Sequence, residues 1–395
     1  MDIGYDSPVS APLDGVLIAD FTRVLAGPYA TMLLADLGAT VVKVERPVSG
    51  DDTRAWMPPV DVDGQSTYFD SVNRNKHSID LDIADAADLA IALRLAQRAD
   101  VVVENFKVGA LDRYGLGYEQ VKDRNPAVVY CSITGFGSGA GADLPGYDIL
   151  VQAMGGLMSV TGIDEPTKAG VAVVDVLTGL HATVAILAAL RHRETTGIGQ
   201  HVEVSLLSSL LSSLVNQASA YAVAGVIPTL MGNAHPSIVP YDVYATADRP
   251  LVIAVGNDAQ FARMVRAIGE PDLAGDPRFA TNALRVANRG VLEEVLLSRL
   301  AQHGADHWQQ VIGAVGVPCG PVNDIADAFA LATRLGLDPI VEVADPRRDG
   351  PRPQVANPVR YGRTPVRYRS APPKVGEDRD AVLALLGLGN ASSGT

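Results

Sequence analysis

The chain has 395 residues, a formal net charge of −13 at pH 7 and a hydrophobic content of 47%. This length and composition suit two or three domains, or one large α/β body with an insertion. A nucleic-acid partner is not expected, because such a partner requires a basic face.

The two cysteines, Cys131 and Cys319, are too few for a disulfide framework, and no Cys/His cluster has metal-ligand spacing. We therefore expect reduced thiols, no bound metal and a cytoplasmic location. The first ten residues contain acidic side chains and no apolar run, so no signal peptide is expected.

Two apolar stretches, residues 171–190 and 205–226, require comparison with membrane-spanning helices. The first contains Asp175 and His181, and a carboxylate at the centre of a bilayer costs roughly 2.5–3.5 kcal/mol. The second is interrupted by repeated serine pairs. Buried helices explain both stretches better than a membrane does.

The first 135 residues alternate between expected strands and helices. This rhythm predicts a Rossmann-like α/β domain, in which helices cover a parallel sheet. The expected elements, in chain order, are a strand at 15–21, a helix at 27–37, a strand at 40–45, a helix at 85–98, and strands at 100–104 and 127–133.

The remaining chain changes character near residue 225. We expect a large domain at 1–224, a smaller α+β domain at 225–330, and a segment at 331–395 that returns to the large domain. The further expected elements are a helical region at 146–193 broken at 162–170, a strand at 200–204, a long helix after it, a hairpin of 241–246 with 250–255, and helices at about 257–268, 290–303 and 380–386.

Several cofactor and catalytic motifs are absent from the sequence. The turn after the first strand reads Thr-Arg-Val-Leu-Ala-Gly-Pro and has no GxGxxG, and the glycine run at 135–141 does not lead into a helix. There is no phosphate-binding GxxxxGK[ST] loop and no GxSxG elbow. His303 and His307 are spaced i, i+4 but lack a general-base Glu, which indicates a solvated helix end.

Asp175 interrupts the apolar run Gly-Val-Ala-Val-Val-Asp-Val-Leu at 170–177. A carboxylate in such surroundings is costly unless it is hydrogen-bonded or placed for chemistry. The pattern leaves two compatible interpretations open, a helix N-cap or a functional carboxylate near unpaired backbone N–H groups that could stabilise an oxyanion.

Basic and polar residues follow two of the expected strands. Arg46 comes directly after one strand, and Asn105, Phe106, Lys107 and Arg113 come after another. Ligands of open parallel sheets bind at the carboxyl ends of the strands. Each charge alone is more often a solvated surface residue, but their coincidence at strand ends predicts a crevice for a phosphorylated ligand.

The chain resembles the class III CoA-transferase family, which includes formyl-CoA transferase, carnitine CoA-transferase and acyl-CoA racemase. The matching segments are in family order and cover most of the first 210 residues. They are 15–28, 37–47, 73–82, 100–116, 125–137, 146–148, 174–182 and 196–206.

The resemblance implies that Asp175 is a nucleophile that attacks an acyl-CoA thioester, with Tyr147 and Asp148 as a Tyr–acid pair beside it. Coenzyme A is then a substrate that arrives as a thioester, a carboxylic acid is the acceptor, and no tightly bound cofactor is expected. The residues that correspond to the family's CoA contacts are Leu25, Ala26, Arg46, Leu81, Asn105, Phe106 and Arg113.

The resemblance also implies an interlocked homodimer. Two departures from the formyl-CoA transferase pattern stand out. Leu25 occupies a position where that type has Gln, and Gly232-Asn-Ala-His-Pro replaces a flexible run of glycines. The loop around Gly232, Asn233 and His235 resembles the branch that uses succinyl-CoA with dicarboxylic acceptors, and His235 and Asn233 are candidate partners for a second carboxylate.

Two alternatives remain from the sequence. An α-methylacyl-CoA racemase would use a His/Asp acid–base pair, but this chain has Tyr147 where racemases carry His, and a phenol is a poor substitute for an imidazole. A non-catalytic acyl-CoA binding protein would keep the CoA cleft but would have no reason to keep Asp175.

Overall fold

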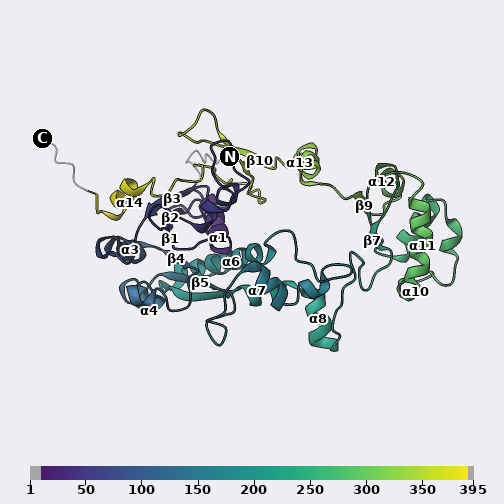
Figure 1. The fold of residues 1–395 in the computed structure, drawn as a ribbon, viewed down its shortest axis with the longest axis horizontal. Coiled ribbons are helices and arrows are strands. Elements are labelled where there is room, and N and C mark those ends of the chain that lie inside the picture. The colour runs from purple at the N-terminus through teal and green to yellow at the C-terminus, as the bar shows by residue number, and fades with distance from the viewer. Residues whose placement is uncertain (1–9, 390–395) are drawn as a thin grey trace, which may run out of the picture. The chain divides into compact units, whose positions relative to one another are not determined.

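The computed structural model describes residues 10–389 and divides them into two compact units (Figure 1). Unit 1 holds the described residues up to Leu157, Ala169–Val226 and the described residues from Asp338 onward. Unit 2 holds Met158–Lys168 and Ile227–Leu337. No sequence feature indicated that the short segment at 158–168 groups with unit 2. The expectation about a signal peptide concerns residues that lie almost wholly outside those described.

Unit 1 is built on a six-stranded parallel sheet, which confirms the expected Rossmann-like α/β fold. Ile18 in the central strand pairs with Val41 on one side and Val101 on the other. The strands, in order across the sheet, are β3 (Lys76–Asp80), β2 (Thr40–Glu45), β1 (Leu17–Asp20), β4 (Val101–Glu104), β5 (Val129–Thr134) and β6 (Gln200–Ser205).

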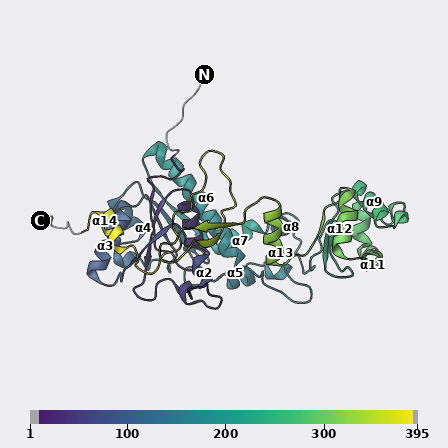
Figure 2. The same ribbon diagram turned by 90° about the horizontal axis from the view of Figure 1, so that it is seen from above.

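Helices cover both faces of this sheet, as the alternation of side chains along each strand requires. Ile18 belongs to the core under α1, α6 and α7, whereas the next residue, Ala19, belongs to the core under α3, α4 and α14 (Figures 1 and 2). The helices of unit 1 are α1 (Ala26–Asp36), α2 (Thr67–Asp70), α3 (Ala86–Arg98), α4 (Tyr118–Arg124), α5 (Asp148–Met154), α6 (Val173–Thr196), α7 (Leu206–Ser213), α8 (Val215–Ala224) and α14 (Arg379–Leu386), with 3₁₀ turns η1 (Asp52–Ala55) and η2 (Asp112–Tyr114).

Strand β3 was not expected from the sequence, because its side chains are mostly polar. Lys76 and Ser78 are nevertheless buried, and each has a partner inside the protein. The Lys76 ammonium donates to Asp20 Oδ2 at 3.1 Å, and the Ser78 hydroxyl donates to Glu45 Oε1 at 2.6 Å. An ion pair and a hydrogen bond to a carboxylate therefore replace the apolar run by which a buried strand is usually recognised.

Helix α6 is the long apolar helix that carries Asp175. Among the described residues it is the one helix long and apolar enough to cross a membrane, with a mean hydropathy of 2.0. Its residues Ala182, Ile186 and Leu190 are buried in the core beneath the sheet. Gly179 lies so close to α1 that an added Cβ would approach the Ala26 carbonyl oxygen to 2.6 Å. This packing accounts for the apolar residues on the buried side of α6.

The long helix expected after residue 205 is divided into α7 and α8. The division falls at Val215, whose φ is +40°. An α-helix requires a negative φ, so a single helix cannot continue through this residue. A positive φ is also rare for a β-branched residue. Helical periodicity alone carries no sign of such a break.

Unit 2 is a small α+β unit with an antiparallel sheet. The expected hairpin is present as β7 (Tyr241–Tyr244) and β8 (Leu251–Ala254), and a third strand, β9 (Cys319–Pro321), pairs with β8. Trp308 and Phe279 are buried in its core. The remaining elements are η3 (Met158–Val160), α9 (Asp258–Ala267), η4 (Pro271–Ala274), α10 (Asn282–Ala287), α11 (Arg289–Leu300), α12 (Ala305–Ala314) and α13 (Ile325–Arg334).

The C-terminal segment packs on unit 1 through arginines. It begins with an antiparallel pair, β10 (Ile340–Val343) and β11 (Arg352–Val355). Arg352 is almost fully buried and donates to Asp70 Oδ2 at 2.6 Å, and Arg369 donates to the carbonyl oxygens of Ala35 at 3.0 Å and Ala39 at 2.9 Å. The Arg369 contacts lie at the C-terminal end of helix α1, whereas the Arg352 contact is with the last residue of α2.

Candidate active site

A carboxylate from helix α5 caps the start of helix α6. The N-cap residue of α6, Ala172, has no side chain that can accept a hydrogen bond. Asp148 Oδ1 instead accepts from the backbone N–H of Val174 at 2.8 Å and of Asp175 at 3.3 Å. Asp175 is thus the third residue of α6, and the N-cap interpretation of this residue is wrong.

This cap also changes what the first turn of α6 can bind. The N–H of Val173 donates to Val171 O at 2.7 Å, and that of Val176 donates to Ala172 O at 3.2 Å. Together with the two bonds to Asp148, these contacts use the N–H groups of the first four residues of the helix. The expected unpaired N–H groups beside Asp175 are therefore engaged, so an oxyanion there needs another donor.

Two carboxylates are held side by side by this arrangement. The pKa of the Asp175 carboxyl is raised from 3.8 to about 7, chiefly by burial and secondly by the like charge of Asp148. Asp148 itself is held by Gln152, whose amide donates to Asp148 Oδ2 at 2.6 Å. Asp175 thus combines a carboxylate that is poorly solvated with a fixed negative neighbour.

Tyr68 is a third member of the site that sequence analysis missed. Burial raises the pKa of the Tyr68 phenol to about 12, and the nearby charges of Asp175, Asp148 and Asp51 contribute in the same direction. Its ring meets that of Trp56 edge to face, with 5.2 Å between centroids. Tyr68 lies in the four-residue helix α2, for which the sequence offers no motif.

Tyr147, the predicted partner of Asp148, precedes α5 as its N-cap residue and is 60% exposed. Tyr68 therefore has the more buried phenol near the two carboxylates, whereas the Tyr147 ring is open to solvent within the described structure.

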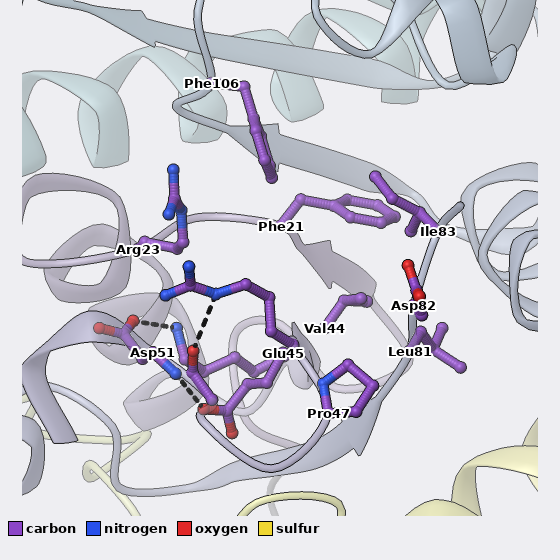
Figure 3. A pocket seen from close by; sticks show the side chains of 13 residues that line it. Phe21, Arg23, Val44, Glu45, Pro47, Asp51, Leu81, Asp82, Ile83 and Phe106 are labelled. Carbon is purple, nitrogen blue, oxygen red and sulfur yellow. Dashed lines mark hydrogen bonds and ion pairs between the residues drawn. The ribbon is translucent and has the colours of Figure 1, made fainter. Parts of the chain in front are cut away.

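A pocket lies at the carboxyl ends of strands β1 to β4 (Figure 3). Its volume is about 240 Å³, and residues that follow each of these four strands line it. Three predicted residues, Arg46, Leu81 and Phe106, meet in this pocket. The parallel sheet therefore brings together side chains that are 60 residues apart in the sequence.

Arg23 lines the same pocket and was missed by sequence analysis. Its guanidinium carbon lies 5.2 Å from the centroid of the Phe106 ring, and Figure 3 shows the two side chains next to each other. Arg23 also pairs with Asp52 at 3.0 Å, and Arg46 pairs with the other oxygen of the same carboxylate. The two partly exposed arginines thus share one carboxylate, and Asp82 also lines the pocket.

The other residues predicted to contact CoA do not line this pocket. Asn105 bonds to the backbone of Arg23, accepting from its N–H at 2.9 Å and donating to its C=O at 2.8 Å. Leu25 and Ala26 are buried where α1 begins. Arg113 is exposed on η2, and its guanidinium lies 4.8 Å from the Tyr114 ring.

The predicted substrate loop belongs to unit 2. Gly232 has a φ of +59°, Asn233 is exposed, and the ring of His235 lies 5.1 Å from that of Tyr241. His235 Nδ1 accepts from the backbone N–H of Ser237 at 3.0 Å. Local packing thus orders His235, and its role toward a substrate stays a prediction.

Across residues 10–389, no group of three or more His, Cys, Asp or Glu side chains is placed to hold a metal ion. Cys131 is buried, and burial raises the pKa of its thiol to about 12. Burial also raises the pKa of the Cys319 thiol. Neither thiol is therefore ionised near neutral pH.

Comparison with known proteins places the chain in a family. Residues 13–379 match the model of CoA-transferase family III. The chain is 43% identical over 389 residues to the succinate–glutarate CoA-transferase of Agrobacterium fabrum, covering 95% of this chain and 96% of that protein. It is 41% identical over 376 residues to the human succinyl-CoA:glutarate CoA-transferase, covering 94% and 85%.

Two solved structures have a fold similar to that of this chain. A CAIB/BAIF family protein from Brucella suis matches with a TM-score of 0.86 and 42% identity, over 96% of this chain and all of that one. A protein from Mycobacterium tuberculosis matches with a TM-score of 0.83 and 30% identity, over 93% and 98%. The chain belongs to CoA-transferase family III, and it is a CoA-transferase enzyme. The resemblance found from the sequence is thereby confirmed.

The raised pKa of Asp175 should make the stability of the protein depend on pH. Between about pH 4 and pH 7 the folded chain keeps a proton that the unfolded chain has lost, so the free energy of unfolding falls as the pH rises through this window. Asp175→Asn removes this penalty. At about pH 8 the variant should unfold at a higher temperature than the wild type, and the difference should shrink toward zero near pH 4. Thermal scans at both pH values measure this, and a difference that is the same at every pH would contradict it.

Proposed function

We propose that this enzyme moves CoA from an acyl-CoA donor to a second carboxylic acid through covalent intermediates on Asp175. The observation that carries the proposal is the pair Asp175 and Asp148 at the start of α6, in the same unit as the arginine-bearing pocket. The two features are also joined through the chain. Arg23 lines the pocket, and the next residue, Val24, packs in one apolar cluster with Val176.

In the first half of the reaction, the Asp175 carboxylate attacks the thioester carbonyl and releases CoA thiolate, which forms a mixed anhydride. The thiolate then attacks the aspartyl carbonyl carbon of that anhydride. This step releases the donor acid with one oxygen from Asp175 and leaves an aspartyl–CoA thioester. The exchange is split into steps that are each easier than a direct transfer.

In the second half, the acceptor carboxylate attacks the aspartyl–CoA thioester and again releases the thiolate. The thiolate attacks the acceptor carbonyl of the new anhydride, so CoA leaves on the acceptor acid and Asp175 is regenerated. The aspartate then carries one oxygen that came from the acceptor. No external oxidant, reductant or metal is needed for this balance.

Three residues have distinct roles in this proposal. Asp148 and burial keep the Asp175 carboxylate basic, so that it is a stronger nucleophile once ionised. Tyr68 stays protonated at neutral pH, so its hydroxyl is a donor available to an oxyanion near Asp175. This donor is needed because the first-turn N–H groups of α6 already have partners.

We further propose that the pocket of unit 1 holds part of the CoA, with its phosphates near Arg46, Arg23 and Arg113. Arg46 and Arg23 are partly exposed and share one carboxylate, that of Asp52, so both guanidinium groups remain accessible to a ligand. Phe106 and Leu81 supply an apolar surface in the same pocket. A charged head and an apolar wall suit a nucleotide-containing thioester.

The names of the relatives support a proposal for the donor and the acceptor. Relatives named for succinyl-CoA or succinate act with glutarate, mesaconate or citramalate, and another is an acetyl-CoA:oxalate CoA-transferase. We propose succinyl-CoA as the donor and a short dicarboxylic acid as the acceptor. His235 and Asn233 of unit 2 are the candidates to bind the second carboxylate.

The interlocked homodimer and the cytoplasmic location also remain proposals. Unit 1 supports the first through exposed apolar side chains on three helices. Ile149 and Met154 on α5, Val184 on α6 and Val223 on α8 are between 52% and 83% exposed. Apolar surface of this kind commonly marks an interface between subunits. The racemase alternative has no comparable support, because the relatives named above are CoA-transferases.

Asp175 should become modified during the reaction. Incubation with succinyl-CoA followed by borohydride or hydroxylamine should trap the activated carboxyl, and peptide mapping should place the modification at Asp175. Asp175→Ala should lose at least about a thousandfold in transfer rate, because the covalent route is closed. The fold should persist, since no partner of a buried charge is removed. Full activity in Asp175→Ala, or a modification on a residue other than Asp175, would contradict the proposal.

Loss of an arginine proposed to lie near the CoA phosphates, whether in the pocket (Arg46, Arg23) or on η2 (Arg113), should weaken the binding of the donor. Arg46→Ala, Arg23→Ala and Arg113→Ala should each raise the half-saturation concentration of succinyl-CoA about tenfold or more, since a charge-assisted contact contributes roughly 1.5–3 kcal/mol. Arg191→Ala is the matched control, because Arg191 is exposed and pairs only with Glu194 across one helical turn. If the pocket variants behave like this control, CoA binds elsewhere.

Short dicarboxylic acceptors should be preferred over monocarboxylic acids of equal length. Initial rates with succinyl-CoA and a panel of glutarate, itaconate, malate, butyrate and formate measure this preference. A preference of about tenfold corresponds to roughly 1.4 kcal/mol in the barrier. His235→Ala should reduce the preference more than it reduces the rate with monocarboxylates. A tenfold preference for formate or a fatty acid would leave CoA transfer standing but would exclude the dicarboxylate assignment.

A further inference from the structure

The turn between β1 and α1, residues 22–25, has a strained backbone. Val24 has a φ of +71°. This region is uncommon for any residue with a Cβ and is an outlier for a β-branched one. Such conformations persist only where the surrounding structure holds them, and they concentrate at functional sites.

Three side chains from other segments hold the backbone of this turn. Lys43 Nζ, from β2, donates to Thr22 O at 2.9 Å. Asn105, after β4, binds both the N–H and the C=O of Arg23. Both carboxylate oxygens of Asp51 accept a hydrogen bond from the backbone N–H of Val24, each at an N–O distance of 3.3 Å. The backbone groups at the strained position therefore depend on side chains, not on a helix or strand.

Lys43 and Asp51 also bind each other. Their ion pair measures 2.8 Å and both side chains are fully buried. Burial opposes both charges, but the Lys43 charge and several hydrogen bonds lower the pKa of Asp51 to about 2. Asp51 additionally accepts from the N–H and the hydroxyl of Thr53. A buried pair of this kind contributes little to stability by itself, so a positional role explains it better.

The turn adjoins both halves of the site. The Arg23 and Asp51 side chains line the pocket (Figure 3), and Lys43 belongs to the same lining. On the other side, Val24 and Leu25 belong to the apolar cluster that includes Tyr68 and Val176. A change in the turn would therefore move the pocket wall relative to Tyr68 and the helix that carries Asp175.

We propose that Lys43 and Asp51 are positioning residues, which hold the strained 22–25 turn so that a thioester bound in the pocket meets Asp175. Neither residue touches the reacting atoms. The proposal rests on the proposed function for its kinetic consequence, whereas the hold on the turn can be tested without any activity.

Amide hydrogen exchange of the full-length protein tests directly whether Lys43 and Asp51 restrain the 22–25 turn. Asp51→Asn and the double variant Lys43→Met/Asp51→Asn remove the charges, and the double variant leaves no unpaired buried charge. A peptide spanning residues 21–26 should exchange at least about fivefold faster in both variants than in the wild type. Arg74→Met is the control, since Arg74 forms a buried pair with Asp36 in the same unit and does not touch the turn. Unchanged exchange in the 21–26 peptide of the two test variants would overturn the proposal.

The kinetic test separates positioning from binding. In single turnovers with succinyl-CoA, both test variants should form the aspartyl–CoA thioester at least about tenfold more slowly, while the Kd of free CoA changes less than about threefold. Arg74→Met should lower the unfolding temperature without slowing this step. An unchanged rate, or a loss of affinity equal to the loss of rate, would overturn the positioning role. If the wild type forms no thioester, the proposed function is wrong. The hydrogen-exchange result would still show whether Lys43 and Asp51 restrain the 22–25 turn.

A double-mutant cycle tests whether strain is what Asp51 opposes. Val24→Gly allows the same φ without strain, so Asp51→Asn should cost at least about threefold less in rate in that background than alone. A merely structural contribution of Asp51 would make the two losses multiply. Multiplying losses would therefore contradict the proposal.

Discussion

The hydrogen bonds from Val174 and Asp175 to the Asp148 carboxylate determine where α6 begins and how its first turn is charged. A helix start that is capped from another helix can carry an apolar residue, Ala172, at its own N-cap position. The same cap fixes a negative charge beside Asp175 and uses the N–H groups that would otherwise surround it. Burial is the main cause of the raised pKa of Asp175, and the charge that this contact places beside it is the second. The need for a separate donor such as Tyr68 follows from the same contact.

Buried ion pairs recur on and beside strands β1, β2 and β3. Lys76 with Asp20, Lys43 with Asp51, and Arg54 with Glu45 are ion pairs placed where an apolar core would be expected. Each makes additional hydrogen bonds, as a buried charge requires. The edge that carries the pocket is therefore held by directional contacts, whereas the two apolar cores hold the helices on the faces of the sheet.

The sequence predicted those parts of the molecule in which local pattern and tertiary role agree. The apolar strands β1, β2, β4 and β5 give the parallel sheet, and the order of the sheet brings Arg46, Leu81 and Phe106 into one pocket. Asp175 was visible as a carboxylate in an apolar run. Strand β3, Arg23 and Tyr68 were not predicted, because burial of polar strand residues and the meeting of distant loops depend on contacts that no local pattern encodes. The capping role of Asp148 was missed for the same reason.

Oxygen transfer into Asp175 is the most direct test of the covalent account. The enzyme is allowed to turn over succinyl-CoA with glutarate whose carboxylates carry heavy oxygen, and the peptide containing Asp175 is then weighed. Transfer through two anhydrides predicts that the Asp175 carboxyl acquires heavy oxygen from the acceptor, while the Asp148 carboxyl in its own peptide does not. Turnover that leaves the Asp175 peptide unlabelled would contradict the account, because CoA would then have passed to the acceptor without an anhydride on this residue.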